Sequence, residues 1–548
     1  MLPLAYSPFT YDQYVLPKLL LGRLLVAVLL VLYCARAAAG RALVIRRTPL
    51  DIPLLLFVAS AALSTVFAEN RNVAVFGTYT RYDGLLTLFT FALLYWLAVQ
   101  SLADADEARA LMRVVLTGGY VVAVVAILQS LHDTVELGAF APAYGTMGNP
   151  NVLGAFLAMA IAVGVTELLV AETVWSRILL INVLIVTGIA IVLSYSRSSW
   201  LATSVAVLLV AAARPTRLRV LAWLAPVVVV LLVVLAAGQL EAPLTSRVST
   251  IVDPRTIETS RGHIWADSLR LIASRPIIGY GPDNVGLVFP RFQTGDWGLT
   301  NSLALGGVRQ PIDKTHAELL QVAATQGVLG VVAYLLIQLA FLRALWRARR
   351  FDQALIAGVG WIAYQLVLQL NFTALAAAQP FWIFAGAAIT SCSAVETRVV
   401  NLRRSYRLLV PAIAVVVAAP LAVWGLATPY LADARLREAV DADFGGHPQR
   451  AEGWAADAQH LVPWESVYAV EVGNLAFEQG AWAPARDAYR RGAELGTFNA
   501  LVYRNLALAD RNLGLLVEAH DAASQAVELD RFDPANQALI AEFTTGNP

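Results

Sequence analysis

The chain of 548 residues has very little from which to build a disulfide framework or a zinc site. Its two cysteines, Cys34 and Cys392, both fall in apolar segments, which argues against either. Lysine is equally scarce, since Lys18 and Lys314 are the only two. Arginine supplies the rest of the positive charge. Charged residues make up 14% of the chain, where soluble domains usually carry about a quarter. The net charge of +1 gives no overall field that would attract nucleic acid.

Apolar residues are abundant instead, at 58% of the chain, and many gather in runs long enough to cross a bilayer. The runs begin near residues 15, 51, 84, 111, 151, 178, 199 and 218, and then near 327, 354, 373 and 408. This pattern predicts an all-α polytopic membrane bundle of about 12 spans within residues 1–427. The first run is not a cleavable signal peptide, because its arginines follow it instead of preceding it.

Arginines between the runs predict the orientation, since cytoplasmic loops of membrane proteins carry an excess of positive charge. The loops expected on the cytoplasmic side hold Arg36, Arg41, Arg46 and Arg47; Arg109 and Arg113; Arg177; Arg214, Arg217 and Arg219; Arg343, Arg347, Arg349 and Arg350; and Arg398, Arg403, Arg404 and Arg407. The N-terminus, a long loop over about residues 240–315 and the region 428–548 are then expected outside.

Residues 428–548 contain an internal repeat. Gly446, Gly480 and Gly514 are 34 residues apart, and the same spacing relates Ala451, Ala485 and Ala519; Ala458, Gly492 and Ala526; and Leu461, Leu495 and Leu529. Small residues at a 34-residue period are typical of tetratricopeptide repeats, in which paired helices cross closely. The sequence therefore predicts a tetratricopeptide-like α-solenoid outside the membrane, with an unrelated stack of helical hairpins as the alternative.

The strongest candidate for chemistry is His316, within Thr315-His316-Ala317-Glu318 and followed by Gly327 and Gly330. Thr315 and Glu318 have the spacing of a capping box, which would place His316 in the first turn of a helix. The positive end of the helix dipole would keep the imidazole neutral and attract an anion. The two glycines would allow close helix packing. A surface histidine at a helix start more often has a structural role. A functional role for His316 therefore depends on the motifs that accompany it.

Two further outward motifs carry arginine. Ser194-Tyr-Ser-Arg197-Ser-Ser-Trp200 is a short turn between two apolar runs, where an arginine can either bind substrate or anchor to lipid headgroups. Arg261-Gly-His-Ile-Trp265 opens an amphipathic stretch that leads to the turn-rich segment 275–284. The plain alternative for that stretch is one external helix and a loop.

Together these motifs resemble the signature of the O-antigen ligase and Wzy O-antigen polymerase superfamily, over about residues 50–395. The histidine with its two later glycines, the Ser-Arg-x-x-Trp turn, the Arg-x-x-x-Trp start and the Pro-x-x-Gly-x-Gly segment at 276–281 all occur in the family's order. The segment Gly148-Asn149-Pro150-Asn151 is also similar to a recurrent family segment. Ala317 departs from the pattern, because this family often has a polar residue there.

The resemblance implies a GT-C-like enzyme of a bacterial inner membrane that transfers a glycan with inversion, without a metal or cofactor. The donor would be a glycan on undecaprenyl diphosphate, and the acceptor a hydroxyl of a glycan, lipid or protein. It implies catalytic roles for His316, Arg197 and Arg261, with substrate binding by Lys314, Arg81, Trp265, Asn284 and Asn149. The repeat domain could bind an acceptor or a protein partner.

Two alternatives come from other classes of protein. A polysaccharide transporter or flippase would bury ionisable groups in the middle of its spans and show inverted repeats, and neither pattern is evident here. A membrane-anchored scaffold built around the repeat domain would not need a dozen spans. Both alternatives are weaker than the enzyme.

The orientation can be tested without knowledge of the activity. In a cysteine-free background, cysteine at Ser302 or in the repeat domain should react with a membrane-impermeant thiol reagent in intact spheroplasts. Cysteine at Ala348 should react only after the membrane is permeabilised. Labelling of Ala348 alone in intact cells would reverse the topology.

Overall fold

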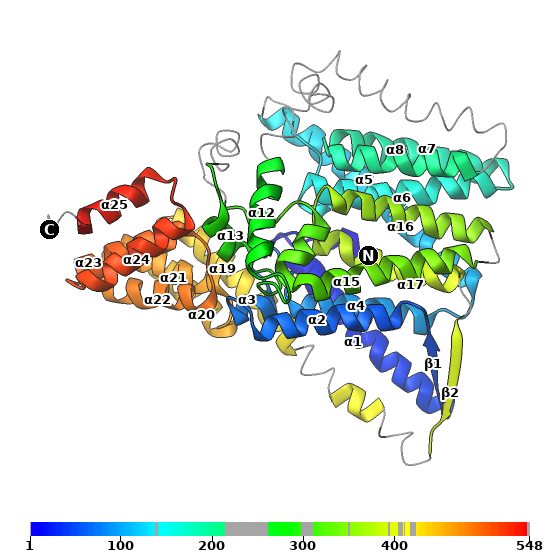
Figure 1. Cartoon of the computed structure of the whole chain (residues 1–548), viewed down its shortest axis with the longest axis horizontal. Coiled ribbons are helices and arrows are strands. Elements are labelled where there is room, and N and C mark those ends of the chain that lie inside the picture. The colour runs from blue at the N-terminus through cyan, green and yellow to red at the C-terminus, as the bar shows by residue number, and fades with distance from the viewer. Residues whose placement is uncertain are drawn as a thin grey trace.

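The computed structural model describes residues 2–137, 141–213, 261–296, 311–348, 351–392, 395–403, 409, 411–416 and 423–544. In these ranges the chain is helical, apart from one two-stranded sheet and the loops between elements. The expected all-α fold is confirmed. Figure 1 shows a bundle of long helices at one end and a stack of shorter helices, α19 to α25, at the other.

The helices of the bundle follow the order of the apolar runs. They are α1 (Leu16–Ala39), α2 (Asp51–Val66), α3 (Arg71–Phe76), α4 (Leu85–Ser101), α5 (Ala105–Leu137), α6 (Pro150–Val170), α7 (Val174–Leu193), α8 (Arg197–Ala213), α12 (His263–Ser274), α13 (Val285–Phe292), α15 (Glu318–Trp346), α16 (Phe351–Gln369) and α17 (Leu375–Cys392). Strands β1 (Ala42–Arg47) and β2 (Glu396–Asn401) and the short helices η1 (Leu2–Leu4), η2 (Gly145–Met147) and η5 (Val423–Ala427) complete this part.

Six of the described helices are long and apolar enough to cross a membrane, namely α1, α5, α6, α7, α15 and α17. Three more, α2, α4 and α8, are apolar but shorter. The expected count of about 12 spans is therefore not confirmed. The run expected near residue 218 lies outside the described residues, as does much of the run expected near 408.

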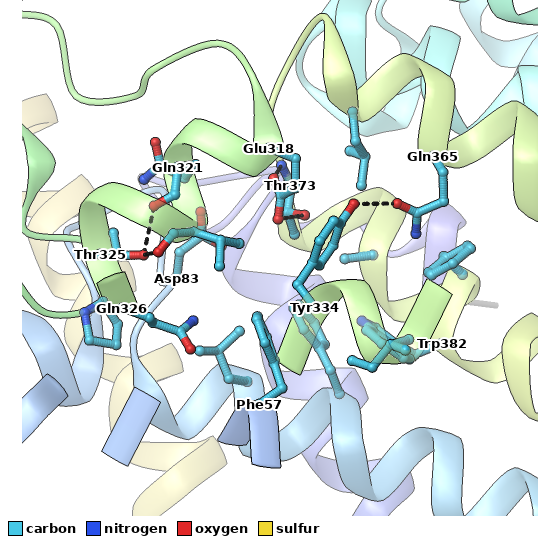
Figure 2. A pocket seen from close by; sticks show the side chains of 18 of the residues that line it. Phe57, Asp83, Glu318, Gln321, Thr325, Gln326, Tyr334, Gln365, Thr373 and Trp382 are labelled. Carbon is cyan, nitrogen blue, oxygen red and sulfur yellow. Dashed lines mark hydrogen bonds between the residues drawn. The ribbon is translucent and has the colours of Figure 1, made fainter. Parts of the chain in front are cut away.

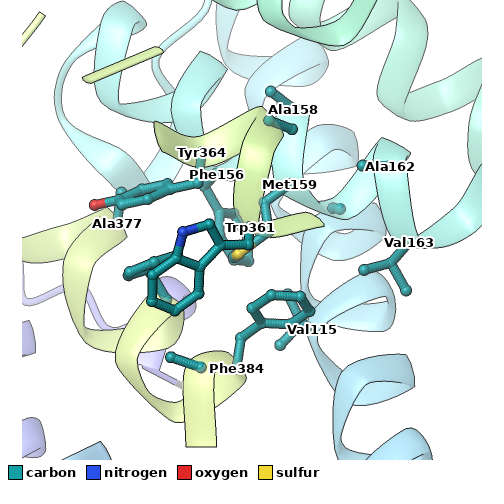
Figure 3. Packing of buried hydrophobic residues seen from close by; sticks show 14 of the residues in the cluster. Val115, Phe156, Ala158, Met159, Ala162, Val163, Trp361, Tyr364, Ala377 and Phe384 are labelled. Atoms are coloured by element: carbon teal, nitrogen blue, oxygen red, sulfur yellow. The ribbon is translucent and has the colours of Figure 1, made fainter. Parts of the chain in front are cut away.

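The centre of the bundle is packed around α6, which is buried along most of its length and contacts α5, α7, α8 and α16. Figure 3 shows Trp361 of α16 lying among side chains of α5, α6 and α17. The Trp361 ring stacks on Phe341 at 3.8 Å and lies 5.0 Å from Phe381. Close packing of this kind holds the helix ends at fixed positions.

The arginine-rich loops meet at one end of the bundle. Strands β1 and β2 pair antiparallel there, with Ile45 opposite Arg398 and Arg47 opposite Glu396. Glu167, near the end of α6, binds Arg109 at 2.8 Å and Arg113 at 3.0 Å. The charge pattern assigns the loops that carry β1 and β2 to the same side, and likewise the loops near Arg109 and Glu167. In each of these two pairs the structure brings the loops together.

Helix α15 is interrupted at Gly327, whose backbone has a φ of 66° that helices do not allow. Segment 276–281 enters the interruption: Val328 N donates to Pro276 O at 2.8 Å, and Gly281 N donates to Thr325 O at 2.9 Å. A Cβ atom at Gly327 would lie 2.2 Å from Ile277 O, so only glycine fits. The expectation that Gly327 serves helix packing is wrong, because this glycine receives segment 276–281 instead.

The repeat region consists of antiparallel helix pairs. Its helices are α19 (Thr428–Phe444), α20 (Pro448–Leu461), α21 (Ser466–Glu478), α22 (Trp482–Leu495), α23 (Ala500–Asn512), α24 (Leu516–Leu529) and α25 (Pro534–Thr544). Gly446, Gly480 and Gly514 occupy the turn within each pair with φ of 71–77°. The alanines of the repeat are fully buried where the helices cross. The tetratricopeptide-like fold is therefore confirmed, and its 34-residue period has a physical cause.

The repeat region rests on the bundle through a buried carboxylate. Asp433 of α19 accepts hydrogen bonds from Asp12 N at 2.8 Å, from the Tyr79 hydroxyl at 2.5 Å and from the Tyr468 hydroxyl at 3.3 Å. Nearby, the Phe76 ring stacks on Trp464 at 5.4 Å. The chain before α1 and the repeat region thus lie at the same end of the bundle.

The interface also contains Glu465, which lines a cavity together with Thr78 and Tyr79. The interface should weaken as pH rises, because Asp433 and Glu465 are more easily protonated in the folded protein than in the unfolded chain. Burial raises the pKa of Glu465 from 4.5 to about 8, and burial likewise raises the pKa of Asp433 from 3.8 to about 6. Stability should therefore fall from about pH 4 to pH 8, with Glu465 responsible above about pH 6.5. Thermal unfolding in detergent should show a falling Tm between pH 6.5 and 8 that Glu465→Gln removes. The exposed control Glu478→Gln should keep the fall, and a pH-independent wild-type Tm would contradict the assignment.

Candidate functional site

His316 lies before α15, not in its first turn. The helix begins at Glu318, and Ala317 is its extended N-cap residue with no side-chain cap. Glu318 instead binds the backbone N and the hydroxyl of Thr373, both at 2.8 Å. The predicted capping box is therefore wrong, because a neighbouring loop takes the carboxylate that would have closed it.

The His316 side chain is partly buried in a cationic environment. Its ring meets Phe372 edge to face at 5.3 Å, and its buried Nδ1 has no hydrogen-bond partner among the described residues. Burial lowers the pKa of His316 from 6.5 to about 4. The positive charges of Arg261, Arg81 and Lys314 act in the same direction, and the charge of Asp313 opposes them. The imidazole is therefore neutral at physiological pH, as a base must be.

His316 also has a strained backbone, with a φ of 55°. Thr80, Tyr82, Tyr195 and Asp283 share this left-handed conformation, so four of the other five such non-glycine residues in the described chain lie in segments around the site. Each costs about 1–3 kcal/mol and persists only where surrounding contacts impose it. Such strain gathers at functional sites.

Lys314 is buried between two carboxylates. Its Nζ lies 2.7 Å from Asp83 Oδ2 and 2.7 Å from Asp283 Oδ1, and the side chain is 2% exposed. Burial disfavours the ammonium charge, but Asp283, Asp83 and Asp313 outweigh it and raise the pKa of Lys314 above its usual value. Asp283 also accepts hydrogen bonds from the Thr78 N at 2.7 Å and hydroxyl at 2.9 Å. Lys314 thus ties the loop before α4 to the loop before α13.

Arg81 lies on the open side of this ion cluster. Its guanidinium binds Asp313 through Nε at 2.6 Å and Nη2 at 3.3 Å, and it lies 5.3 Å from the centre of the Phe372 ring. The side chain is 35% exposed, so part of the guanidinium faces solvent. Arg81 and His316 thus flank the same phenylalanine.

Arg197 and Arg261 form a second cationic pair, whose member Arg261 acts on the histidine. Arg197 is the first residue of α8, after a turn in which the Ser196 and Ser199 hydroxyls bond at 2.8 Å. Burial and the charge of Arg197 lower the pKa of Arg261, and the charge of Arg261 acts on His316. Like charges are held close only when other structure imposes it, and an anion between them would relieve the repulsion.

The remaining predicted residues lie in different settings. Asn284 is fully buried and binds backbone only, since its Oδ1 accepts from Asn70 N at 2.8 Å and its Nδ2 donates to Pro282 O at 2.8 Å. Asn149 caps α6 by accepting from Asn151 N at 2.8 Å. Trp265 lies in α12, one turn after Arg261, and its buried indole N–H has no partner among the described residues.

Two cavities adjoin the site, and Asp83 lines both. The outer one has a volume of about 320 Å³, and its walls include Arg81, Asn149 and Phe372. The inner one lies toward the bundle, where Glu318 binds Thr373 and Tyr334 binds Gln365 (Figure 2). The outer cavity therefore brings Arg81 and Asn149 together, next to the ring that contacts His316.

Several residues of the site escaped the sequence analysis. Asp83, Asp283 and Asp313 hold the basic side chains, and Phe372 connects His316 to Arg81. A lysine in an apolar chain is a usable signal, because a buried ammonium group needs oxygen partners, which are carboxylates at Lys314. Which aspartates supply it depends on the tertiary fold and has no local pattern.

Residues 181–335 match a family model described as O-Antigen ligase. The matched range runs from within α7 into α15 and contains Arg197, Arg261, Lys314 and His316. No curated protein matches the chain. A solved structure titled "Crystal structure of APC/C hetero-tetramer Cut9-Hcn1" aligns with 83% of this chain and 90% of that chain, at 14% sequence identity and a TM-score of 0.20.

Lys314 should prove essential for stability and His316 should not. Lys314→Met leaves two buried carboxylates without their cation, which should cost about 3–5 kcal/mol of stability. His316→Ala removes a side chain whose buried nitrogen has no partner among the described residues, so the Tm should change little. Thermal unfolding of both variants in detergent measures the difference. A Lys314→Met protein with the wild-type Tm and weakened donor binding would make Lys314 a substrate-binding residue instead.

Proposed function

We propose that this chain, which carries an O-antigen ligase domain over residues 181–335, transfers a glycan from undecaprenyl diphosphate to an acceptor hydroxyl at the outer face of a bacterial inner membrane. The observation that carries the proposal is a neutral, partly exposed histidine on which the charges of Arg261 and Arg81 act. Few other arrangements suit a reaction whose leaving group is a diphosphate and whose nucleophile is an alcohol.

The arginines supply the charge for the leaving group. Arg197 and Arg261 carry two positive charges at close quarters, and guanidinium groups bind phosphate oxygens in bidentate fashion. As the bond between the anomeric carbon and the diphosphate oxygen breaks, the developing negative charge falls between these groups. Arg81 is partly satisfied by Asp313 and can contribute its exposed face. With the diphosphate charge shared among these arginines, the proposed mechanism needs no metal ion.

His316 accepts the proton of the acceptor hydroxyl as that oxygen forms the new bond to the anomeric carbon, on the face opposite the diphosphate. With a pKa of about 4, the free enzyme's imidazole is a weak base. The donor's diphosphate brings negative charge near Arg261 and offsets the cationic environment that lowers the His316 pKa. Donor binding therefore strengthens the base at the moment the acceptor needs it.

The acceptor approaches through the outer cavity, whose volume of about 320 Å³ is at the lower end of ligand pockets. The repeat domain, which contacts the bundle close to this entrance through Asp433 and Tyr79, presents a surface for a large acceptor or a partner protein. The acceptor can be a glycan, a lipid or a protein.

Transfer from a lipid-diphosphate-linked glycan in detergent, with chelator present, tests these roles. His316→Ala should lose roughly 10²–10⁴-fold in rate while donor binding survives, because it removes only the base. Arg197→Ala and Arg261→Ala should weaken donor binding as well, and lysine should restore little if binding is bidentate.

The control is Arg177→Ala, which removes an exposed arginine in the first turn of α7. Arg197 follows the other end of this helix, so the control should leave transfer unchanged. Normal turnover by His316→Ala would overturn the site. Loss of wild-type activity on adding chelator would overturn the metal-free mechanism.

A further inference from the structure

The segment before α1 is held rigidly at the entrance of the outer cavity. Lys18, which is fully buried, donates from Nζ to Ala5 O at 2.7 Å, Tyr14 O at 2.8 Å and Thr146 O at 2.5 Å. The Asp12 carboxylate accepts hydrogen bonds from the backbone N of Tyr14 at 3.1 Å, and from those of Val15 and Leu16. These contacts fix the backbone of residues 5–16 before any ligand arrives.

This rigid segment presents aromatic side chains that the fold leaves partly exposed. Tyr6 is 45% and Tyr11 49% exposed, and the Tyr14 ring lies 5.4 Å from Tyr6 and 5.9 Å from Tyr144. Tyr11, Gln13 and Tyr14 line the outer cavity together with Arg81. Aromatic faces and an amide side chain thus border one pocket.

Tyr14 owes its position to the glycine of the Gly-Asn-Pro-Asn segment. Gly148 has a φ of 71°, and a Cβ atom there would lie 2.6 Å from the Tyr14 Cβ. Any other residue would push the tyrosine away from the cavity. The motif at 148–151 therefore shapes the cavity wall as well as capping α6.

We propose that Tyr11, Gln13 and Tyr14 form a saccharide subsite, in which a sugar ring of the acceptor stacks on the tyrosines next to His316. The proposal rests on the proposed function and specifies its acceptor side. A sugar has an apolar face of C–H groups and a rim of hydroxyls, so it needs aromatic rings and amide or carboxylate groups together. A lipid tail would need neither Gln13 nor the partly exposed Arg81.

The subsite has the correct relation to the reacting groups. Phe372 lines the same cavity, and its ring lies 5.3 Å from the His316 ring. A sugar seated against Tyr11 and Tyr14 would present a hydroxyl toward that histidine. The charge of Arg261, which we assign to the diphosphate, also acts on His316, so donor and acceptor would meet at this histidine.

The test measures binding apart from transfer. Saturation-transfer NMR with the full-length protein in detergent would use free monosaccharides and the oligosaccharide released by mild acid from the cells' own lipid-linked glycan. Tyr11→Ala and Tyr14→Ala should weaken oligosaccharide binding about tenfold, whereas Tyr11→Phe keeps the stacking ring and should bind nearly as well as wild type. In transfer assays the same alanine variants should raise the acceptor KM and leave the donor KM unchanged.

Phe9→Ala is the matched control, since Phe9 is 70% exposed in the same segment but does not line the cavity. Wild-type saccharide binding by both tyrosine variants would overturn the subsite even if transfer is observed. Equal weakening by Phe9→Ala, with reduced binding to anionic lipid vesicles, would make the segment a membrane anchor and also overturn it. Saccharide binding that depends on Tyr11 without any transfer by the wild type would support the subsite and refute the proposed function.

Discussion

The organisation of the site depends on one buried ammonium group. Lys314 is held between Asp83 and Asp283, which come from loops about two hundred residues apart in the sequence. Removing water from three charges is costly, and the cost is recovered only if all three meet in good geometry. The loops that carry them must therefore adopt one arrangement. That arrangement sets Arg81 on Asp313 and gives His316 its left-handed backbone beside Phe372.

The same constraint reaches the repeat domain through the short loop 77–83. Thr78 binds Asp283, Tyr79 binds Asp433 of the repeat region, Arg81 binds Asp313, and Asp83 binds Lys314. Thr80 and Tyr82 are both left-handed, and within this loop Tyr79 contacts the repeat region while Thr78, Arg81 and Asp83 contact the ion cluster of the site. The repeat domain is thus a neighbour of the site as well as a separate stack of helices, and a ligand that displaced it would act on Tyr79, two residues from Arg81.

Features with a period or a composition could be predicted from the sequence. Gly446, Gly480 and Gly514 gave the solenoid, and the positions of ten helices followed from the apolar runs. His316, Arg197 and Arg261 could be singled out because they stand in short motifs, and in the structure the charge of Arg261 acts on His316 and that of Arg197 on Arg261. The capping box failed because Glu318 has a better partner in Thr373, which local spacing does not reveal. The three aspartates and Phe372 could not be predicted, since only the tertiary fold decides which loops meet.

The interruption of α15 at Gly327 has a consequence for the order of biogenesis. In a lipid environment an unpaired backbone N–H is costly, and Val328 N finds its partner only at Pro276 O, in a segment made about fifty residues earlier. That segment must dock on α15 before the backbone of the helix is fully hydrogen-bonded. Completion of this helix and docking of segment 276–281 are therefore coupled. A chain delayed between the two would expose a broken helix to lipid, which makes this step a natural point for quality control during membrane assembly.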